Sequence, residues 1–97
     1  MVIWTQRARS DLKDIHSYIS EDSPATASTV ITAIVEKTGV LTDLPHFGKM
    51  TPEFKDETIR ETSASSWRII YRIQDAQIYI LAIVHKRRVI EGQQSIS

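Results

Sequence analysis

Arginine, histidine and tyrosine side chains gather in two C-terminal segments whose residues are typical of β-strands, 67–73 and 78–86. Arg68 and Arg72 lie in the first segment and Tyr79 in the second, which ends at His85-Lys86-Arg87-Arg88. A guanidinium group offers a planar fork of donors to phosphate or carboxylate, and a tyrosine ring can stack on a base. Histidine can accept and donate protons near pH 7. These residue types predict an anion-binding or RNA-contacting surface.

The pairing of the two segments decides which side chains share a face of the sheet. A turn centred on Asp75 and Ala76 pairs Ile73 with Ile78, Tyr71 with Ile80, Ile69 with Ala82 and Trp67 with Val84. This apolar face is the one that we expect helices to cover. Pleat alternation sends the other set to the opposite face. That set comprises Arg68, Arg72, Tyr79, His85 and Arg87, with Ile70, Leu81 and Ile83 among them.

A structural role is the alternative for the same arginines. Arg68 and Arg72 would then pair with nearby carboxylates such as Glu61 or Asp75. A slip of one residue in the register would also separate the set, because it moves every side chain to the other face. The sequence leaves both interpretations open.

Other kinds of site are not expected. The chain has no cysteine, which excludes disulfides and thiol nucleophiles. His16 and His46 lack the spacing of metal ligands, so we predict no metal and no cofactor. With glycine only at positions 39, 48 and 92, the chain has no glycine-rich phosphate loop.

The N-terminal half predicts a helical hairpin. After a short edge strand at residues 2–5, Thr5 can cap a helix, on which Arg7 and Asp11 lie one turn apart and can pair. Ser23 and Pro24 then begin a second helix, which should end near Leu44, before Pro45. Each helix carries an apolar stripe at helical spacing. The stripes are Ala8, Leu12, Ile15 and Ile19, and then Ala27, Ile31, Ile34, Thr38 and Leu41, widened by Val30 and Val35.

The C-terminal half predicts a small sheet. Residues 45–57 are turn-rich and are expected to form a surface loop, and a short strand should follow at 58–62. The order β-α-α-β-β-β predicts an α+β fold, in which an N-terminal helical hairpin packs on one face of a small antiparallel-dominated sheet. We expect one domain over residues 1–97, with 89–97 as a flexible tail.

Composition and charge narrow the functional classes. The chain of 97 residues is 41% hydrophobic and 25% charged, which is globular rather than disordered. Its net charge of zero excludes a generic polycation, yet residues 1–57 carry six basic and nine acidic side chains and residues 58–97 carry six and three. The longest apolar run, 78–84, is far too short to span a membrane. We therefore expect a soluble, cytoplasmic protein.

Four segments resemble toxins of the ParE/RelE superfamily, in the same order and spacing. They are Trp4-Thr5-x-x-Ala8-x-x-Asp11-Leu12-x-x-Ile15-x-x-Tyr18-Ile19, Leu44-Pro45-x-x-Gly48, Trp67-Arg68-Ile69-Ile70-Tyr71-Arg72-Ile73 and Ile83-Val84-His85-Lys86-Arg87-Arg88. The resemblance extends over about residues 2–88. It implies a helical hairpin on a small antiparallel sheet, which agrees with the elements predicted above.

The resemblance implies a toxin with one of two targets. RelE-type members cut mRNA on the ribosome, whereas ParE-type members inhibit DNA gyrase and so block replication. Arg68 and Arg87 match two arginines of the RelE site, but residues 59–61 lack its lysines and the tail lacks its tyrosine. The His-x-Arg-Arg ending and the long second helix resemble ParE, so we favour a gyrase inhibitor that is not an enzyme. The alternatives are an mRNA endoribonuclease that uses Arg68, His85 and Arg87, or a degenerate toxin that only binds its antitoxin.

The resemblance also implies a cognate antitoxin that silences the toxin, in a system that maintains a plasmid or chromosome segment. We expect no membrane partner and no direct DNA binding by the toxin alone. The predicted antitoxin contacts are Leu12, Ile15, Ile19, Arg68, Arg72 and Arg87. The predicted target contacts are Arg60, Arg68, Arg72, Tyr79, His85, Lys86, Arg87 and Arg88.

Overall fold

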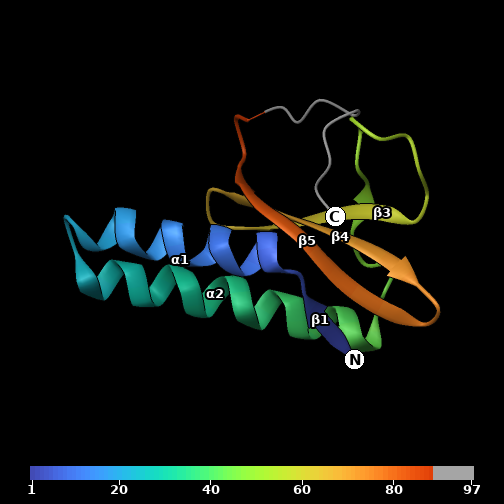
Figure 1. Cartoon of the computed structure of the whole chain (residues 1–97), viewed down its shortest axis with the longest axis horizontal. Coiled ribbons are helices and arrows are strands. Elements are labelled where there is room, and N and C mark those ends of the chain that lie inside the picture. Colours follow the sequence, from blue (N-terminus) through green and yellow to red (C-terminus); the bar gives the residue numbers. More distant parts are fainter. Residues whose placement is uncertain (89–97) are drawn as a thin grey trace.

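The computed structural model of the chain describes residues 1–88, and it has the predicted α+β architecture (Figure 1). The elements are β1 (Val2–Trp4), α1 (Gln6–Ser20), α2 (Pro24–Asp43), β2 (Lys49–Met50), β3 (Ile59–Ala64), β4 (Trp67–Gln74) and β5 (Gln77–His85). The tail predicted at 89–97 lies outside the described residues. Neither of the helices in the described part is both long and apolar enough to cross a membrane.

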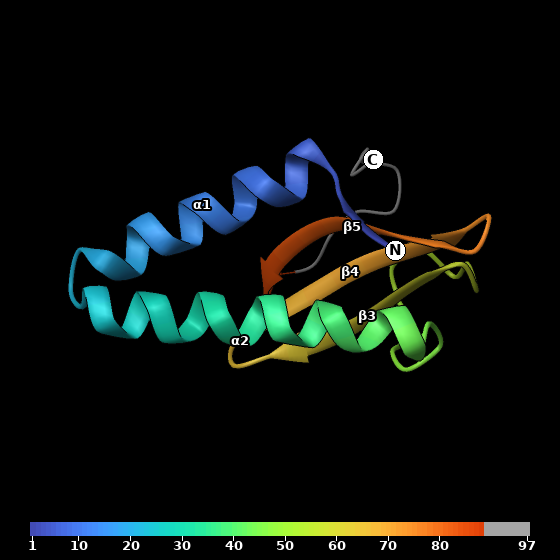
Figure 2. The ribbon, with the colours of Figure 1, turned by 90° about the horizontal axis from the view of Figure 1, so that it is seen from below.

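The two helices begin at the predicted caps. The Thr5 hydroxyl accepts a hydrogen bond from the Ala8 amide at 3.2 Å, and it donates to the Ile80 carbonyl at 2.7 Å, which fastens the start of α1 to β5. The Ser23 hydroxyl accepts from the Thr26 amide at 3.1 Å, and Pro24 occupies the first turn of α2. The helices run side by side, and the turn between them extends past the sheet (Figures 1 and 2).

The five strands form one sheet in the order β1-β5-β4-β3-β2. Only the pairing of β1 with β5 is parallel, and β1 is an edge strand as predicted. The prediction of a loop throughout 45–57 was wrong at Lys49 and Met50, which pair with Glu61 and Arg60 as β2. The strand predicted at 58–62 begins and ends later, at Ile59–Ala64.

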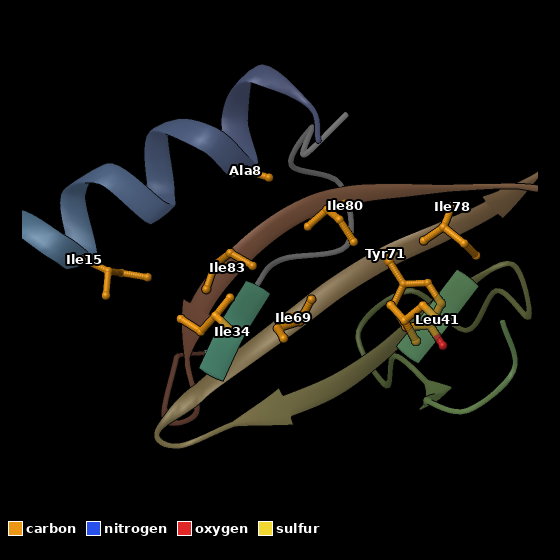
Figure 3. Packing of buried hydrophobic residues seen from close by; sticks show 9 residues of the cluster. All are labelled: Ala8, Ile15, Ile34, Leu41, Ile69, Tyr71, Ile78, Ile80 and Ile83. Carbon is orange, nitrogen blue, oxygen red and sulfur yellow. The ribbon is translucent and has the colours of Figure 1, made fainter. Parts of the chain in front are cut away.

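The helical hairpin covers one face of the sheet and encloses the main core (Figure 3). The buried side chains of this core are Ala8, Ile15, Ile34, Leu41, Ile69, Tyr71, Ile78, Ile80 and Ile83. Most residues of the two predicted stripes belong to this core or pack against it, but Val35 is 45% exposed and does not belong to the core. A second cluster lies on the other face, which we call the open face. It comprises Ile59, Ile70, Leu81, Ala82 and Val84, with Phe54 and Tyr79 packed against it.

A β-bulge in the β4–β5 hairpin corrects the predicted register. Next to the turn, Ile73 pairs with Ile78 and Tyr71 with Ile80, as predicted. Between Ile70 and Tyr71 the register shifts by one residue, so that Ile69 pairs with Ile83 and Trp67 with His85. The predicted pairs Ile69–Ala82 and Trp67–Val84 were therefore wrong. The shift turns Ala82 and Val84 to the open face, and Ile83 and His85 to the helical side.

Candidate functional site

Arg68 is the centre of the polar cluster on the open face, where only 8% of the residue is exposed. Its Nη1 and Nη2 donate to the two carboxylate oxygens of Glu53 at 2.8 and 2.7 Å. Its Nη2 and Nε donate to Glu61 at 2.6 and 3.3 Å, and Nη1 also donates to the Arg88 carbonyl at 2.8 Å. A guanidinium group has five N–H donors, and here all of them are engaged within the protein.

The electrostatics of this cluster favour a permanent internal ion pair. The hydrogen bonds to Glu53 and then to Glu61 raise the pKa of Arg68 above its already high value, and burial opposes them only in part. Both carboxylates are nearly buried, with about a tenth of each side chain exposed (11% and 11%). Arg68 therefore pairs with Glu61, as the structural alternative in the sequence analysis predicted.

An open cavity of about 840 Å³, which we call the open-face cavity, adjoins the cluster. The Arg68, Glu53 and Glu61 side chains line it together with three further cations, Lys49, Lys86 and Arg88. Lys49 comes from the edge strand β2, whereas Lys86 and Arg88 follow the end of β5. The cavity thus joins the free edge of the sheet to the C-terminal basic segment.

The strand that supplies Lys49 is held in place by Tyr71 and Arg60. The Tyr71 hydroxyl donates to the Pro45 carbonyl at 2.7 Å and accepts from the Gly48 amide at 3.0 Å. Arg60 donates from Nε to the Gly48 carbonyl at 2.9 Å and from Nη1 to the Glu57 carbonyl at 3.3 Å. Burial raises the pKa of Tyr71 above its usual range, although the Gly48 amide and Arg60 oppose that shift. Arg60, predicted as a target contact, thus serves to hold the chain that leads into β2.

The predicted basic set is divided between the two sides of the sheet. Arg68, Arg72 and Tyr79 share the open face, and Arg72 pairs directly with Tyr79. His85 lies on the helical side instead, where its ring meets Trp67 edge to face with centroids 5.3 Å apart. Its Nδ1 accepts from the Arg87 amide at 3.2 Å. The predicted grouping of His85 with Arg68 was therefore wrong, because the bulge reverses the alternation of β5.

Comparison with known proteins identifies the family to which this chain belongs. A family model described as the ParE toxin of type II toxin–antitoxin systems, parDE, matches residues 2–90. The chain belongs to this ParE toxin family.

Relatives of this ParE-family toxin carry names from both branches of the superfamily. Toxin RelE2 of Caulobacter vibrioides is 30% identical over 88 residues, which cover 90% of this chain and 96% of that protein. The chromosomal ParDE system of P. aeruginosa includes a similar structure, with a TM-score of 0.72, 24% identity, and coverage of 87% of this chain and 92% of that one. The toxin–antitoxin complex RelBE2 of Mycobacterium tuberculosis includes another, with a TM-score of 0.63, 25% identity, and coverage of 91% and 92%.

The antitoxin contacts predicted on the first helix of this ParE-family toxin lie largely in its core. Ile15 is 5% exposed, and Leu12 and Ile19 are partly buried against the same cluster. Ile15 is therefore not available at the surface. Exposed side chains that are accessible to a partner lie just beyond β5, at Lys86, Arg87 and Arg88.

Two structural contacts of the ParE-family toxin were not predicted from the sequence. Glu53 lies in the segment predicted as a loop, and nothing in its neighbourhood indicates a partner at position 68. Asp11 was predicted to pair with Arg7, which is confirmed at 3.1 Å, but it also accepts the Ile83 amide of β5 at 3.0 Å. That contact spans the helix and the sheet, and only a known register could have predicted it.

Proposed function

We propose that this member of the ParE family acts in the cytoplasm as an inhibitor of DNA gyrase and that a cognate antitoxin neutralises it. RNA cleavage is the alternative, and it requires a cation facing the phosphate together with an acid or base at the same place. All five donors of Arg68 are engaged within the protein, and the two neighbouring carboxylates are themselves held in hydrogen bonds to this guanidinium group. His85 points to the other side of the sheet. This division of Arg68 from His85 is the observation that favours gyrase inhibition over cleavage.

The match of the ParE family model over residues 2–90 supports the same branch. Names alone do not decide it, because the relatives include both a RelE2 toxin and a ParDE system. A protein that inhibits gyrase needs a binding surface and no catalytic group. The exposed segment Lys86–Arg88 and the cavity beside it offer such a surface.

The antitoxin partner is supported by the similar structures, which come from a ParDE system and from a toxin–antitoxin complex. Besides Arg68, three cations line the open-face cavity: Lys49, Lys86 and Arg88. Electrostatic complementarity then calls for an antitoxin segment with acidic side chains at this face. Apolar antitoxin side chains would meet the exposed Phe47 beside the same cavity.

Two assays on the purified toxin test the proposal. We expect inhibition of gyrase supercoiling and intact mRNA in a translating-ribosome reaction. Cut mRNA with normal supercoiling would establish the endoribonuclease instead. No effect in either assay, with tight binding to the antitoxin, would establish a degenerate toxin. Addition of the antitoxin in equimolar amount should restore supercoiling, which controls for nonspecific inhibition.

A further inference from the structure

Arg68 joins three segments of the chain. Glu53 belongs to the chain between β2 and β3, Glu61 belongs to β3, and the Arg88 carbonyl follows the end of β5. Hydrogen bonds between charged groups are about twice as strong as neutral ones, and the contact with Glu53 uses both nitrogens of the fork. The guanidinium group thus fastens the C-terminal basic segment to the open face of the sheet.

The basic segment Lys86–Arg88 has a defined backbone in spite of its exposure. The Lys86 amide donates to the Ser66 carbonyl at 2.8 Å, and the Arg88 amide donates to the His85 carbonyl at 2.9 Å. These two bonds tie the segment to its own hairpin. The bond from Arg68 to the Arg88 carbonyl, at 2.8 Å, ties its far end to Glu53 and Glu61 through a charged group. Arg68 is therefore one of the groups that fix the backbone from which the three basic side chains extend.

We propose that Arg68 is a positioning residue, which holds Lys86–Arg88 in the shape that meets the toxin's target and does not contact the target itself. The inference rests on the proposed function, since it concerns the surface through which the toxin acts. It differs from the catalytic role that the resemblance to RelE toxins implies for Arg68, together with His85 and Arg87, in an mRNA endoribonuclease. Carboxylates at 2.6–2.8 Å occupy the directions from which a phosphate would approach.

The two roles predict opposite effects when the carboxylates are neutralised. In Glu53→Gln and Glu61→Gln, the shape of the side chain is kept while the charged hydrogen bond is weakened. If Arg68 positions the basic segment, each variant should raise the half-inhibitory concentration for gyrase by about tenfold, because the segment loosens. If Arg68 binds a target anion, each variant should lower that concentration, because the guanidinium charge is released.

Amide hydrogen exchange provides a measurement that does not depend on the target. Exchange at Lys86 and Arg88 should become about tenfold faster in both variants, while the circular dichroism of the fold stays unchanged. Glu57→Gln is the matched control, because it makes the same change of charge at an exposed position in the same connection. It should change neither the exchange nor the inhibition. Arg68→Lys, which keeps the charge but loses the planar fork, should behave like the two glutamine variants.

The outcomes separate this inference from the proposed function. A wild-type toxin that leaves gyrase active contradicts the proposed function, and the exchange measurement then still decides whether Arg68 holds the segment. Unchanged exchange in both glutamine variants overturns the inference whatever the target is. Stronger inhibition by either variant overturns it as well, in favour of a direct contact.

Discussion

Gly48 is the residue on which the edge of the sheet depends. A Cβ added there would lie 2.8 Å from the Tyr71 hydroxyl and would also collide with the Glu61 carbonyl. Because the neighbours are backbone and a buried ring, they cannot move aside easily. Gly48→Ala should lower the free energy of unfolding by about 1–3 kcal/mol, measured by urea denaturation.

Gly39 provides the matched control for this prediction. It lies within α2, and a Cβ added there meets nothing within 4 Å. Alanine is favoured over glycine inside a helix by about 0.5–1 kcal/mol, so Gly39→Ala should stabilise the protein. The same substitution should therefore change the free energy of unfolding in opposite directions at the two positions. Equal destabilisation by both would refute the close approach at Gly48.

Tyr71 makes stability depend on pH in the alkaline range. Burial raises the pKa of its hydroxyl in the folded protein above the value of about 10 that it has when unfolded. The stability that the protonated hydroxyl contributes is fully present below pH 10, and it is lost as the pH rises toward the folded pKa. Tyr71→Phe should cost about 1–3 kcal/mol at pH 7, since the Gly48 amide and Pro45 carbonyl lose their partner.

The test follows the difference in the free energy of unfolding between the wild type and Tyr71→Phe. In urea denaturation from pH 7 to pH 11, it should stay constant up to about pH 9.5 and then shrink. Tyr18→Phe is the control, because the Tyr18 side chain is 71% exposed. A gap that stays the same at pH 11 would show that burial does not affect Tyr71 ionisation.

At the scale of elements, the sequence predicted the helices well because their signals are local. Thr5, Ser23 and Pro24 mark the helix starts through contacts within three residues, and each was found in its predicted place. The turn at Asp75 and Ala76 was equally predictable. Both residues have positive φ, 52° and 63°, as a tight hairpin of this kind requires.

The β-bulge was not predictable, since residues 78–84 are almost all apolar and carry no alternation to reveal which side each one faces. Beside the bulge, the Thr5 hydroxyl donates to the Ile80 carbonyl at 2.7 Å and to the Leu81 carbonyl at 3.3 Å. That contact joins residues 76 positions apart. Two features of the candidate site could not be predicted for the same reason. The partnership of Glu53 with Arg68 and the side of the sheet on which His85 lies both depend on tertiary contacts.

Asp11 fastens α1 to the part of β5 that β1 leaves uncovered. β1 pairs with β5 only as far as Ile80, and beyond it the Asp11 carboxylate accepts the Ile83 amide at 3.0 Å. Asp11→Ala would leave that amide without its partner at a site where the Asp11 side chain is only 18% exposed. We expect the free energy of unfolding to fall by about 1–2 kcal/mol.

Arg7→Ala separates the two interactions of Asp11. It removes the ion pair at 3.1 Å on the surface of α1 and leaves the bond to Ile83 intact. Exposed pairs of this spacing contribute about 0.3–0.5 kcal/mol, so the loss should be several times smaller than in Asp11→Ala. Chemical denaturation of both variants measures this ratio, and equal losses would assign the whole effect to the ion pair.

At the scale of the whole molecule, the zero net charge conceals a separation along the chain. Residues 1–57 carry three more acidic than basic side chains, and residues 58–97 carry three more basic than acidic ones. In the fold, the two carboxylates of Glu53 and Glu61 outweigh the single charge of Arg68. The other cations that line the open-face cavity are Lys49, Lys86 and Arg88. The positive character of this face therefore comes from its rim and not from the buried arginine.

An acidic antitoxin segment bound at this rim should lose affinity as salt is added. Exposed charges are screened over about 8 Å at physiological ionic strength, so the dissociation constant should rise about tenfold between 0.05 and 0.5 M NaCl. The double variant Lys86→Gln and Arg88→Gln should weaken binding and flatten this dependence. The double variant Arg9→Gln and Lys13→Gln makes the same change of charge at exposed positions of α1. It should change neither the affinity for the antitoxin nor its dependence on salt. Titration calorimetry at several salt concentrations measures each slope, and equal slopes for the two double variants would place the antitoxin elsewhere.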